Sequence, residues 1–193
     1  DDGDLDAFVT SHHRQSRVRL NDGSGTFTDF QTIDGTGYGH TESVELGDLD
    51  DDGDLDAFVT THRNDNRVLL NDGNATFTDS GQRLGGAHNT MDVALGDIDN
   101  DGDLDAFVND FHGQNDKVWL NDGSGTFTLG QTVSGIHHTG GIDLGDLDDD
   151  GDLDAFVVNG HGNDKVLLND GSGTFTDFQT IHGTTYGHTE SVE

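Results

Sequence analysis

The stretch DLDDDGDLD, residues 48–56, places six aspartates within nine positions. Carboxylates at this density repel one another in water, and a bound cation would remove that repulsion. Ca²⁺ takes six to eight oxygen ligands, most of them carboxylates and carbonyls, in a flexible shell. The pattern D-x-D-x-D-G-x-x-D offers such oxygens at alternate positions of a curled loop. The stretch therefore predicts a Ca²⁺-binding loop.

In this loop the expected ligands are the side chains of Asp48, Asp50, Asp52 and Asp56 and the backbone carbonyl of Asp54. Gly53 would permit the sharp bend, and Leu55 is expected to point into the core and anchor the loop. Two more complete copies offer Asp97, Asp99, Asp101, Asp103 and Asp105, and then Asp146, Asp148, Asp150, Asp152 and Asp154. The first copy retains Asp2, Asp4 and Asp6, so we expect an incomplete site there.

Other kinds of acidic loop fit less well. An EF-hand carries a bidentate Glu at its twelfth position, where this loop has Val59. The nine-residue Gly-Asp repeats of RTX proteins are absent from the sequence. Mg²⁺ demands strict octahedral geometry, and Zn²⁺ favours His or Cys ligands. A solvated acidic turn without any ion remains the alternative to a Ca²⁺ loop.

The segment DGDLDAFV occurs four times, with its glycine at Gly3, Gly53, Gly102 and Gly151, at intervals of 49 or 50 residues. Each copy is followed by a variant of RVLLNDGNATFT. Short β-branched and aromatic runs flank the acidic loop and an Asn-Asp-Gly turn, which predicts four antiparallel strands per repeat and no helices. This composition is typical of a propeller blade.

The expected fold is therefore an all-β propeller with four-stranded blades, four repeats to the chain. We expect the units at residues 1–41 together with a C-terminal strand at 187–193, then at 42–89, 90–138 and 139–186. The tail Gly187–Glu193 copies Gly39–Glu45, which favours a ring closed by a blade shared between the first and last segments. The blades could also close as an eight-bladed dimer or belong to a longer array.

Composition restricts the partners. The net charge of -31 repels nucleic acid and anionic membrane surfaces, and no apolar run reaches membrane-spanning length. We therefore expect neither nucleic-acid binding nor membrane insertion. Without cysteine, disulfides reveal nothing about the compartment.

Histidines gather in the two loops expected at the face opposite the acidic loops. The candidates are His12, His40, His62, His88, His112, His138, His161 and His188. Such a face could bind a transition metal, a glycan or a protein, or could respond to pH. The alternative is that histidine is a tolerated loop residue copied with the repeat.

Catalysis has little support in the sequence. G-x-S-x-G, H-E-x-x-H and P-loop motifs are absent, as is a cysteine nucleophile. Aspartate pairs can imitate a glycosidase dyad, but Ca²⁺ binding accounts for them more simply. We therefore expect a protein that is not an enzyme, with polysaccharide degradation as the weaker alternative.

The acidic loop, the AFV strand and the LNDGSGTFT hairpin together resemble the FG-GAP or VCBS repeat of integrin-α-type β-propellers, over essentially the whole chain. The resemblance implies one structural Ca²⁺ per complete loop. It also implies an extracellular or cell-surface module for adhesion or glycan binding, in a homo-oligomer or a longer array. A purely structural scaffold, such as a filament, an adhesin or an engineered symmetric protein, is the main alternative.

Overall fold

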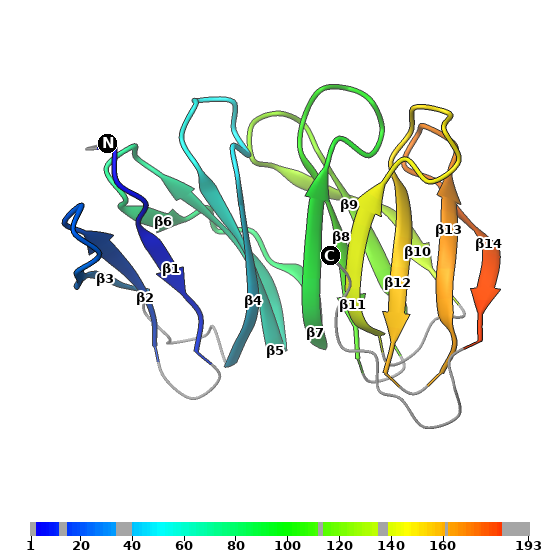
Figure 1. Cartoon of the computed structure of the whole chain (residues 1–193), viewed down its shortest axis with the longest axis horizontal. Coiled ribbons are helices and arrows are strands. Elements are labelled where there is room, and N and C mark those ends of the chain that lie inside the picture. The colour runs from blue at the N-terminus through cyan, green and yellow to red at the C-terminus, as the bar shows by residue number, and fades with distance from the viewer. Residues whose placement is uncertain are drawn as a thin grey trace.

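The computed structural model describes residues 3–11, 15–33, 40–111, 114–134, 139–160 and 162–182, and these form strands joined by turns (Figure 1). The strands are β1 (Ala7–Val9), β2 (Ser16–Asn21), β3 (Phe27–Ile33), β4 (His40–Gly47), β5 (Asp56–Asn71), β6 (Phe77–Asp79), β7 (Leu84–Gly96), β8 (Asp105–Asp110), β9 (Asp116–Asn121), β10 (Phe127–Val133), β11 (Thr139–Gly145), β12 (Asp154–Asn159), β13 (Asp164–Asn169) and β14 (Phe175–Ile181). Every strand pairing is antiparallel. The all-β, antiparallel prediction is thus confirmed.

Each repeat contributes one group of strands. The first repeat forms the sheet β1-β2-β3, and the fourth forms β11-β12-β13-β14. The second and third repeats share a seven-stranded sheet of order β10-β9-β8-β7-β5-β4, with β6 paired to β5. They merge because the first half of β7 pairs with β5 and its second half pairs with β8.

The second repeat departs from the expected four separate strands. Its second and third strands form one 16-residue strand, β5. The turn between them stays in the ladder because Asn64 pairs with His88, and Asn66 with Leu84, on β7. The strand count in this repeat was therefore predicted wrongly.

The four repeats stand side by side in a row with their strands roughly parallel to a common direction (Figure 1). The sheet β1-β2-β3 and the sheet β11-β12-β13-β14 lie at opposite ends of this row. The strands that the structure describes therefore do not close a ring. The tail 187–193, to which ring closure was assigned, lies outside the described residues.

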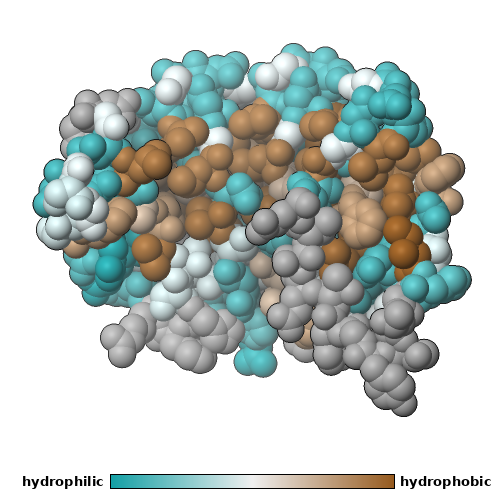
Figure 2. All heavy atoms as spheres, in the orientation of Figure 1, coloured by the Kyte–Doolittle hydropathy of each residue, from teal (hydrophilic) through white to brown (hydrophobic). Residues whose placement is uncertain are grey.

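The core lies between neighbouring repeats. Three apolar clusters join the first repeat to the second, the second to the third, and the third to the fourth. At each junction, the Phe of an AFV strand packs edge to face against a Phe of the next repeat, the one that follows its Asn-Asp-Gly turn. The ring centroids are 5.2 Å apart for Phe8–Phe77, 5.4 Å for Phe58–Phe127 and 5.0 Å for Phe107–Phe175. Figure 2 shows the hydrophobic side chains as a belt across the middle of one face.

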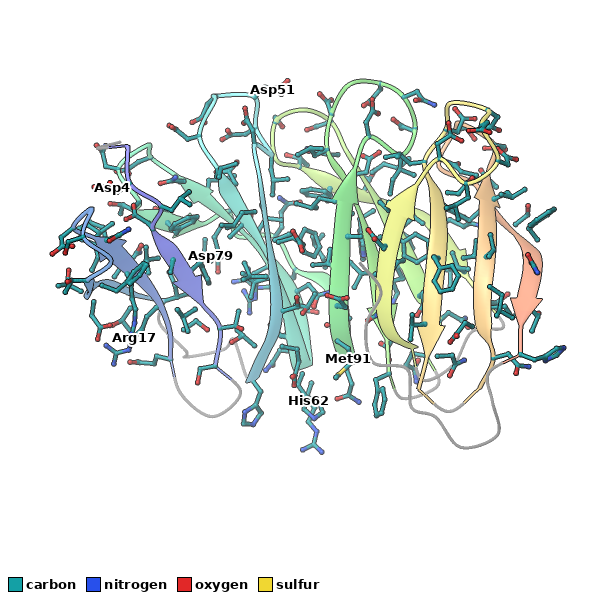
Figure 3. All side chains as sticks on the ribbon, viewed as in Figure 1. Asp4, Arg17, Asp51, His62, Asp79 and Met91 are labelled. Carbon is teal, nitrogen blue, oxygen red and sulfur yellow. The ribbon has the colours of Figure 1, made fainter. Side chains whose placement is uncertain are left out.

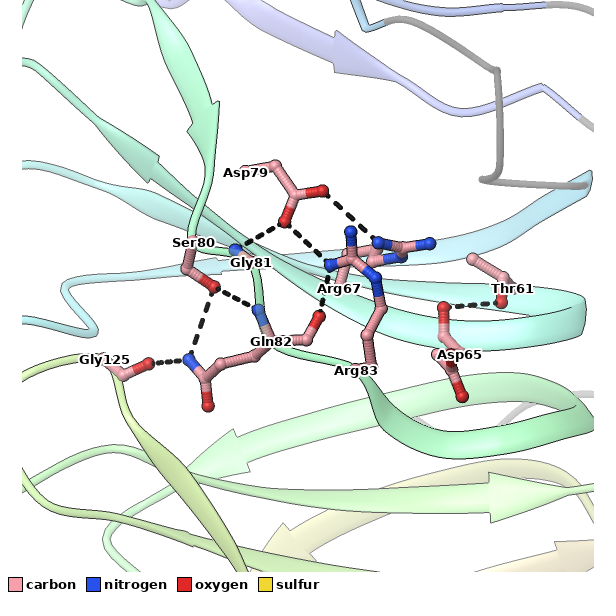
Figure 4. Close-up of polar contacts among 9 residues, drawn as sticks. All are labelled: Thr61, Asp65, Arg67, Asp79, Ser80, Gly81, Gln82, Arg83 and Gly125. Carbon is pink, nitrogen blue, oxygen red and sulfur yellow. Dashed lines mark hydrogen bonds and ion pairs between the residues drawn. The ribbon is translucent and has the colours of Figure 1, made fainter.

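Polar side chains add a second link between repeats. Gln131 bonds the backbone of Phe175 twice, donating to its carbonyl at 2.9 Å and accepting from its N–H at 2.7 Å. Gln31 makes the same pair of bonds to Phe77. Gln82 accepts from the Phe127 N–H at 2.8 Å and donates to the carbonyl of Gly125 (Figure 4). Gln31 and Gln131 lie on the outer strands β3 and β10, and Gln82 lies between β6 and β7, so each glutamine fastens the last part of one repeat to the next repeat.

Within the described ranges, no helix is long and apolar enough to cross a membrane.

Candidate metal centres

Three groups of carboxylates lie along one side of the row, at one end of the strands, each in the turn that leads into the second strand of a repeat. They are Asp48, Asp50 and Asp56; Asp97, Asp99 and Asp101; and Asp146, Asp148 and Asp154. In each group, one carboxylate oxygen per residue lies within 4.8 Å of the others. The acidic pattern therefore converges in space in all three complete copies.

In the second and fourth repeats, the first aspartate of the loop accepts hydrogen bonds from the backbone ahead of it, which curls the loop. In the second repeat, Asp48 accepts hydrogen bonds from the N–H groups of Asp52 at 3.2 Å and Gly53 at 3.0 Å. Asp146 accepts from Asp150 and Gly151 in the same way, at 3.1 and 3.0 Å. Gly53 has a φ of 92°, which L side chains rarely adopt, so glycine is needed at this bend.

The last aspartate of each complete loop is fully buried and fixes the loop to the third strand. Asp56 accepts from the N–H of Leu49 at 3.0 Å and from the N–H of Asn71 at 2.7 Å. Equivalent bonds reach Asp105 from Ile98 and Asn121, and reach Asp154 from Leu147 and Asn169. Each of these carboxylates thus holds the loop in place before any cation is considered.

The loops concentrate negative charge that is poorly compensated. Burial raises the pKa of Asp105 to about 6, against the donated bonds of Asn121 and Ile98. Burial and then the charge of Asp52 raise the pKa of Asp50. Burial, and then the charge of the aspartate two positions further along the loop, likewise raise the pKa values of Asp99 and Asp148. A cation among these groups would favour their charged forms.

Two loop oxygens have no donor. Oδ1 of Asp50 and Oδ1 of Asp97 are buried and make no hydrogen bond. A buried carboxylate oxygen without a donor or a cation is energetically costly. The donor set consists of oxygens alone, without His or Cys, and so suits a hard cation such as Ca²⁺ better than Zn²⁺.

Positions five and seven of the loop lie differently. Asp52 is not in the three-carboxylate group of its loop, and its Oδ1 accepts from the N–H of Asp54 at 2.9 Å. The side chain of Asp54 leaves the loop and lies against Gly73, where an added Cβ would collide with its Oδ2. Asp103 and Asp152 lie in the same way against Gly123 and Gly171. This leaves the backbone carbonyl as the available ligand atom at position seven.

The three groups differ in their members. In the second and fourth repeats they combine positions one, three and nine, and leave out Asp52 and Asp150. In the third repeat the group combines positions one, three and five and leaves out Asp105. The five predicted ligands of a loop are therefore only partly brought together.

The first loop differs from the others. Asp2 lies outside the described residues. Asp6 accepts from the N–H of Asn21 at 2.9 Å, as its counterparts do, and Asp4 lies against Gly23. In the described part of this loop, no group of three carboxylates forms.

The expected burial of Leu55 is wrong, since its side chain is 56% exposed. Its counterparts Leu104 and Leu153 lie over Gly47 and Gly96 of the preceding repeat, within 2.7 Å of an added Cβ. Leu55 instead lines a groove of about 550 Å³ between the first two repeats. The packing partner of this leucine is thus a neighbouring repeat and not its own core.

The histidines that the structure describes lie at the other end of the strands. Figure 3 shows His62 and Asp51 at opposite ends of the molecule. His40 pairs with His62 across β4 and β5, with ring centroids 6.1 Å apart, and Glu42 Oε1 lies 3.7 Å from His62 Nδ1. The side chains of the remaining candidates, His12, His88, His112, His138, His161 and His188, lie outside the described residues.

Sequence reasoning missed one group of residues. Asn121 and Asn169 open the Asn-Asp-Gly turns, and their side chains reach the acidic loop of the preceding repeat. These turns were interpreted as tight hairpins alone. The partner atoms are backbone carbonyls about seventy positions away, which leave no signal in the spacing of residue types.

Comparison with known families supports the repeat assignment. The model of the FG-GAP-like repeat matches residues 1–59, 48–108 and 146–193. A comparison with curated proteins gave no match. The matched segments cover most of the chain and each contains an acidic loop, so the chain belongs to the FG-GAP-like repeat family.

Proposed function

We propose that the chain is a Ca²⁺-stabilised, β-propeller-type repeat module that binds a partner at the face opposite its metal loops. The observation that carries the proposal is the convergence of three carboxylates in each complete loop, with donorless buried oxygens on Asp50 and Asp97. Structural turns do not require such oxygens, whereas a cation would pair with them.

The ion would be held by residues that the fold has already placed. Asp48, Asp50 and Asp56 would supply carboxylate oxygens in the second repeat, with the carbonyl of Asp54 and water completing the shell. Bound Ca²⁺ supplies two positive charges against the mutual repulsion of the loop. The binding free energy then adds to the folding free energy, because an unfolded chain has no preformed site.

Stabilisation of this kind suits the composition. Only 30% of the residues are hydrophobic, and the described core is divided into three clusters between repeats. The acidic loops sit beside these interfaces. Rigid loops would therefore keep neighbouring repeats in register and leave the opposite face free for recognition.

We place the recognition surface around His40, Glu42 and His62, which lie together at that opposite face. Imidazole and carboxylate groups side by side suit a glycan or a polar protein surface. Membership of a family of repeat modules supports an extracellular adhesion role. The near-identity of the repeats favours the second candidate, a structural scaffold.

Isothermal titration with Ca²⁺ tests the metal proposal. We expect one ion per complete loop in the wild-type chain, and one fewer in Asp50→Asn. Asp51→Asn is the matched control, because it removes the same charge from the same loop at a position where the third repeat has Asn100. Equal stoichiometry in wild type and Asp50→Asn, or binding of Mg²⁺ as tight as that of Ca²⁺, would contradict the proposal.

A glycan array and a pull-down from extracellular matrix test the recognition role separately. We expect the Ca²⁺-loaded chain to give reproducible hits that His62→Ala weakens and that His182→Ala, which replaces an exposed histidine after β14 in the fourth repeat, does not. Silence in both assays would favour the scaffold.

A further inference from the structure

Asn121 links two acidic loops. It lies at the end of β9 and is only 5% exposed. Its Nδ2 donates to the carbonyl of Leu49 at 2.9 Å and to the carbonyl of Leu104 at 3.2 Å. Leu104 belongs to the loop of its own repeat, whereas Leu49 belongs to the loop of the preceding repeat.

The same arrangement recurs one repeat later. Asn169, at the end of β13, is also 5% exposed. Its Nδ2 donates to Ile98 of the preceding loop at 2.7 Å and to Leu153 of its own loop at 3.1 Å. In both cases the hydrogen bond across the repeat boundary is shorter than the hydrogen bond within the repeat. The amide is therefore positioned at least as well for the preceding loop as for its own.

The hydrogen bond across the repeat boundary reaches the backbone between the first two candidate ligands of the preceding loop. Leu49 lies between the candidate ligands Asp48 and Asp50, and Ile98 lies between Asp97 and Asp99. The side chains of Leu49 and Ile98 are buried, and their N–H groups donate to Asp56 and Asp105. The residue between the first two ligands is therefore held at its N–H by its own repeat and at its carbonyl by the next.

We propose that Asn121 and Asn169 are positioning residues for the Ca²⁺ loops of the preceding repeats, so that each of these sites is completed by the repeat that follows it. The inference rests on the proposed Ca²⁺ binding and adds which residues set the affinity of each site. Groups that orient metal ligands without touching the metal commonly change affinity 10–100-fold when they are removed. Ca²⁺ affinity in loop 48–56 then depends on a side chain of the third repeat.

The chain contains its own control for this effect. Asn71 occupies the same turn position in the second repeat and donates to Leu55 of its own loop at 3.1 Å. Among the described residues it makes no bond to another acidic loop. Asn71→Ala therefore measures the loss of the bond within a repeat, and Asn121→Ala measures that loss plus the loss of the bond across the boundary.

The test is a Ca²⁺ titration of the whole chain followed by NMR, with the amides of Gly53, Gly102 and Gly151 reporting on the three loops separately. We expect Asn121→Ala to weaken Ca²⁺ binding about 10-fold in loop 48–56 as well as in loop 97–105. Asn169→Ala should do the same to loops 97–105 and 146–154. Asn71→Ala should affect loop 48–56 and leave the other two within about twofold of wild type. If an alanine variant does not fold, Asn→Ser at the same position replaces it.

The outcomes are distinct. A loss confined to the loop of the mutated repeat would overturn the inference while leaving Ca²⁺ binding intact. An equal loss in all three loops would indicate general loosening and would also overturn it. If the NMR signals of the three glycine amides do not shift when Ca²⁺ is added to the wild-type chain, the proposed function itself is overturned, and the inference with it.

Discussion

Asn100 Nδ2 donates to Oδ1 of Asp152, on the acidic loop of the next repeat, at 2.8 Å. The same amide reaches the carbonyl of Gly171 at 3.3 Å. One repeat earlier the equivalent pair is Asp51 and Asp103, and there the charge of Asp51 contributes, after burial and Asp101, to raising the pKa of Asp103. The same junction is thus attractive between the third and fourth repeats and repulsive between the second and third.

Asp51→Asn should therefore stabilise the metal-free chain. The substitution removes a like-charge contact and provides an amide donor for Asp103, and asparagine tolerates the φ of 60° at this position. We expect the melting temperature in chelator to rise by about 2 °C. Asp149→Asn is the control, because it changes the same loop position without a described loop beyond it. Equal effects of the two substitutions would mean that net charge, and not the contact, is responsible.

Gln131→Ala should weaken the junction between the third and fourth repeats. It removes two hydrogen bonds to Phe175 and leaves a part-buried N–H and carbonyl without partners. We expect the free energy of unfolding to fall by about 1–3 kcal/mol, measured by urea denaturation. Gln179 holds the same position in the fourth repeat and makes no such contact among the described residues, so Gln179→Ala should be nearly neutral. A similar loss in both variants would argue against the clamp.

Gly96→Ala should be destabilising because a neighbouring repeat occupies the space. An added Cβ would lie 2.7 Å from Leu153 Cδ1 and 3.2 Å from Leu144 Cδ1. Shifting these side chains should cost about 1–2 kcal/mol in thermal or urea unfolding. At the equivalent Gly145 nothing lies within 4 Å of the added Cβ, so Gly145→Ala should have little effect. The opposite ranking would mean that the leucines do not pack across the boundary as described.

The stability of the metal-free chain should fall as the pH rises from about 4 to about 7. Burial raises the pKa of Asp105 to about 6, above its unfolded value of 3.8, so the folded state binds the proton more tightly in this window. Stability from this group is complete at low pH and is lost as the pH passes about 6, with a ceiling of about 3 kcal/mol. The raised pKa values of Asp50 and Asp56 act in the same direction.

Urea unfolding of the metal-free protein at pH 4.5 and pH 7 measures this slope. The turn residues Asp22, Asp122 and Asp170, whose pKa values are lowered mainly by bonds from Ser24, Ser124 and Ser172, contribute below this window. Asp105→Asn should reduce the fall of the free energy of unfolding with rising pH. Bound Ca²⁺ should also reduce this fall, because the ion favours the charged carboxylates. A metal-free chain that becomes more stable toward pH 7 would contradict the burial of charge described here.

Features within one repeat could be predicted from the sequence, whereas contacts between repeats could not. The alternation around DLDAFV, the Asn-Asp-Gly turns and the aspartate spacing are local, and they predicted the antiparallel strands and the convergence of part of each complete acidic loop. Leu55, Asn121 and Gln131 are different, because their surroundings belong to another repeat. Asn121 and Gln131 form hydrogen bonds across a repeat boundary, and Leu55 lines the groove between the first two repeats. Such partners depend on how two sheets pack, which the spacing of residues within a repeat does not encode. The merging of two strands into β5 has the same origin, since β7 of the next repeat extends the ladder.

A crystal structure of the chain grown in excess Ca²⁺ tests the central claim most directly. We predict one strong density peak in each of the loops 48–56, 97–105 and 146–154, surrounded by oxygens at about 2.3–2.6 Å, with Oδ1 of Asp50 and of Asp97 among them. Loops that stay free of density in such crystals, with both oxygens turned to solvent, would contradict it.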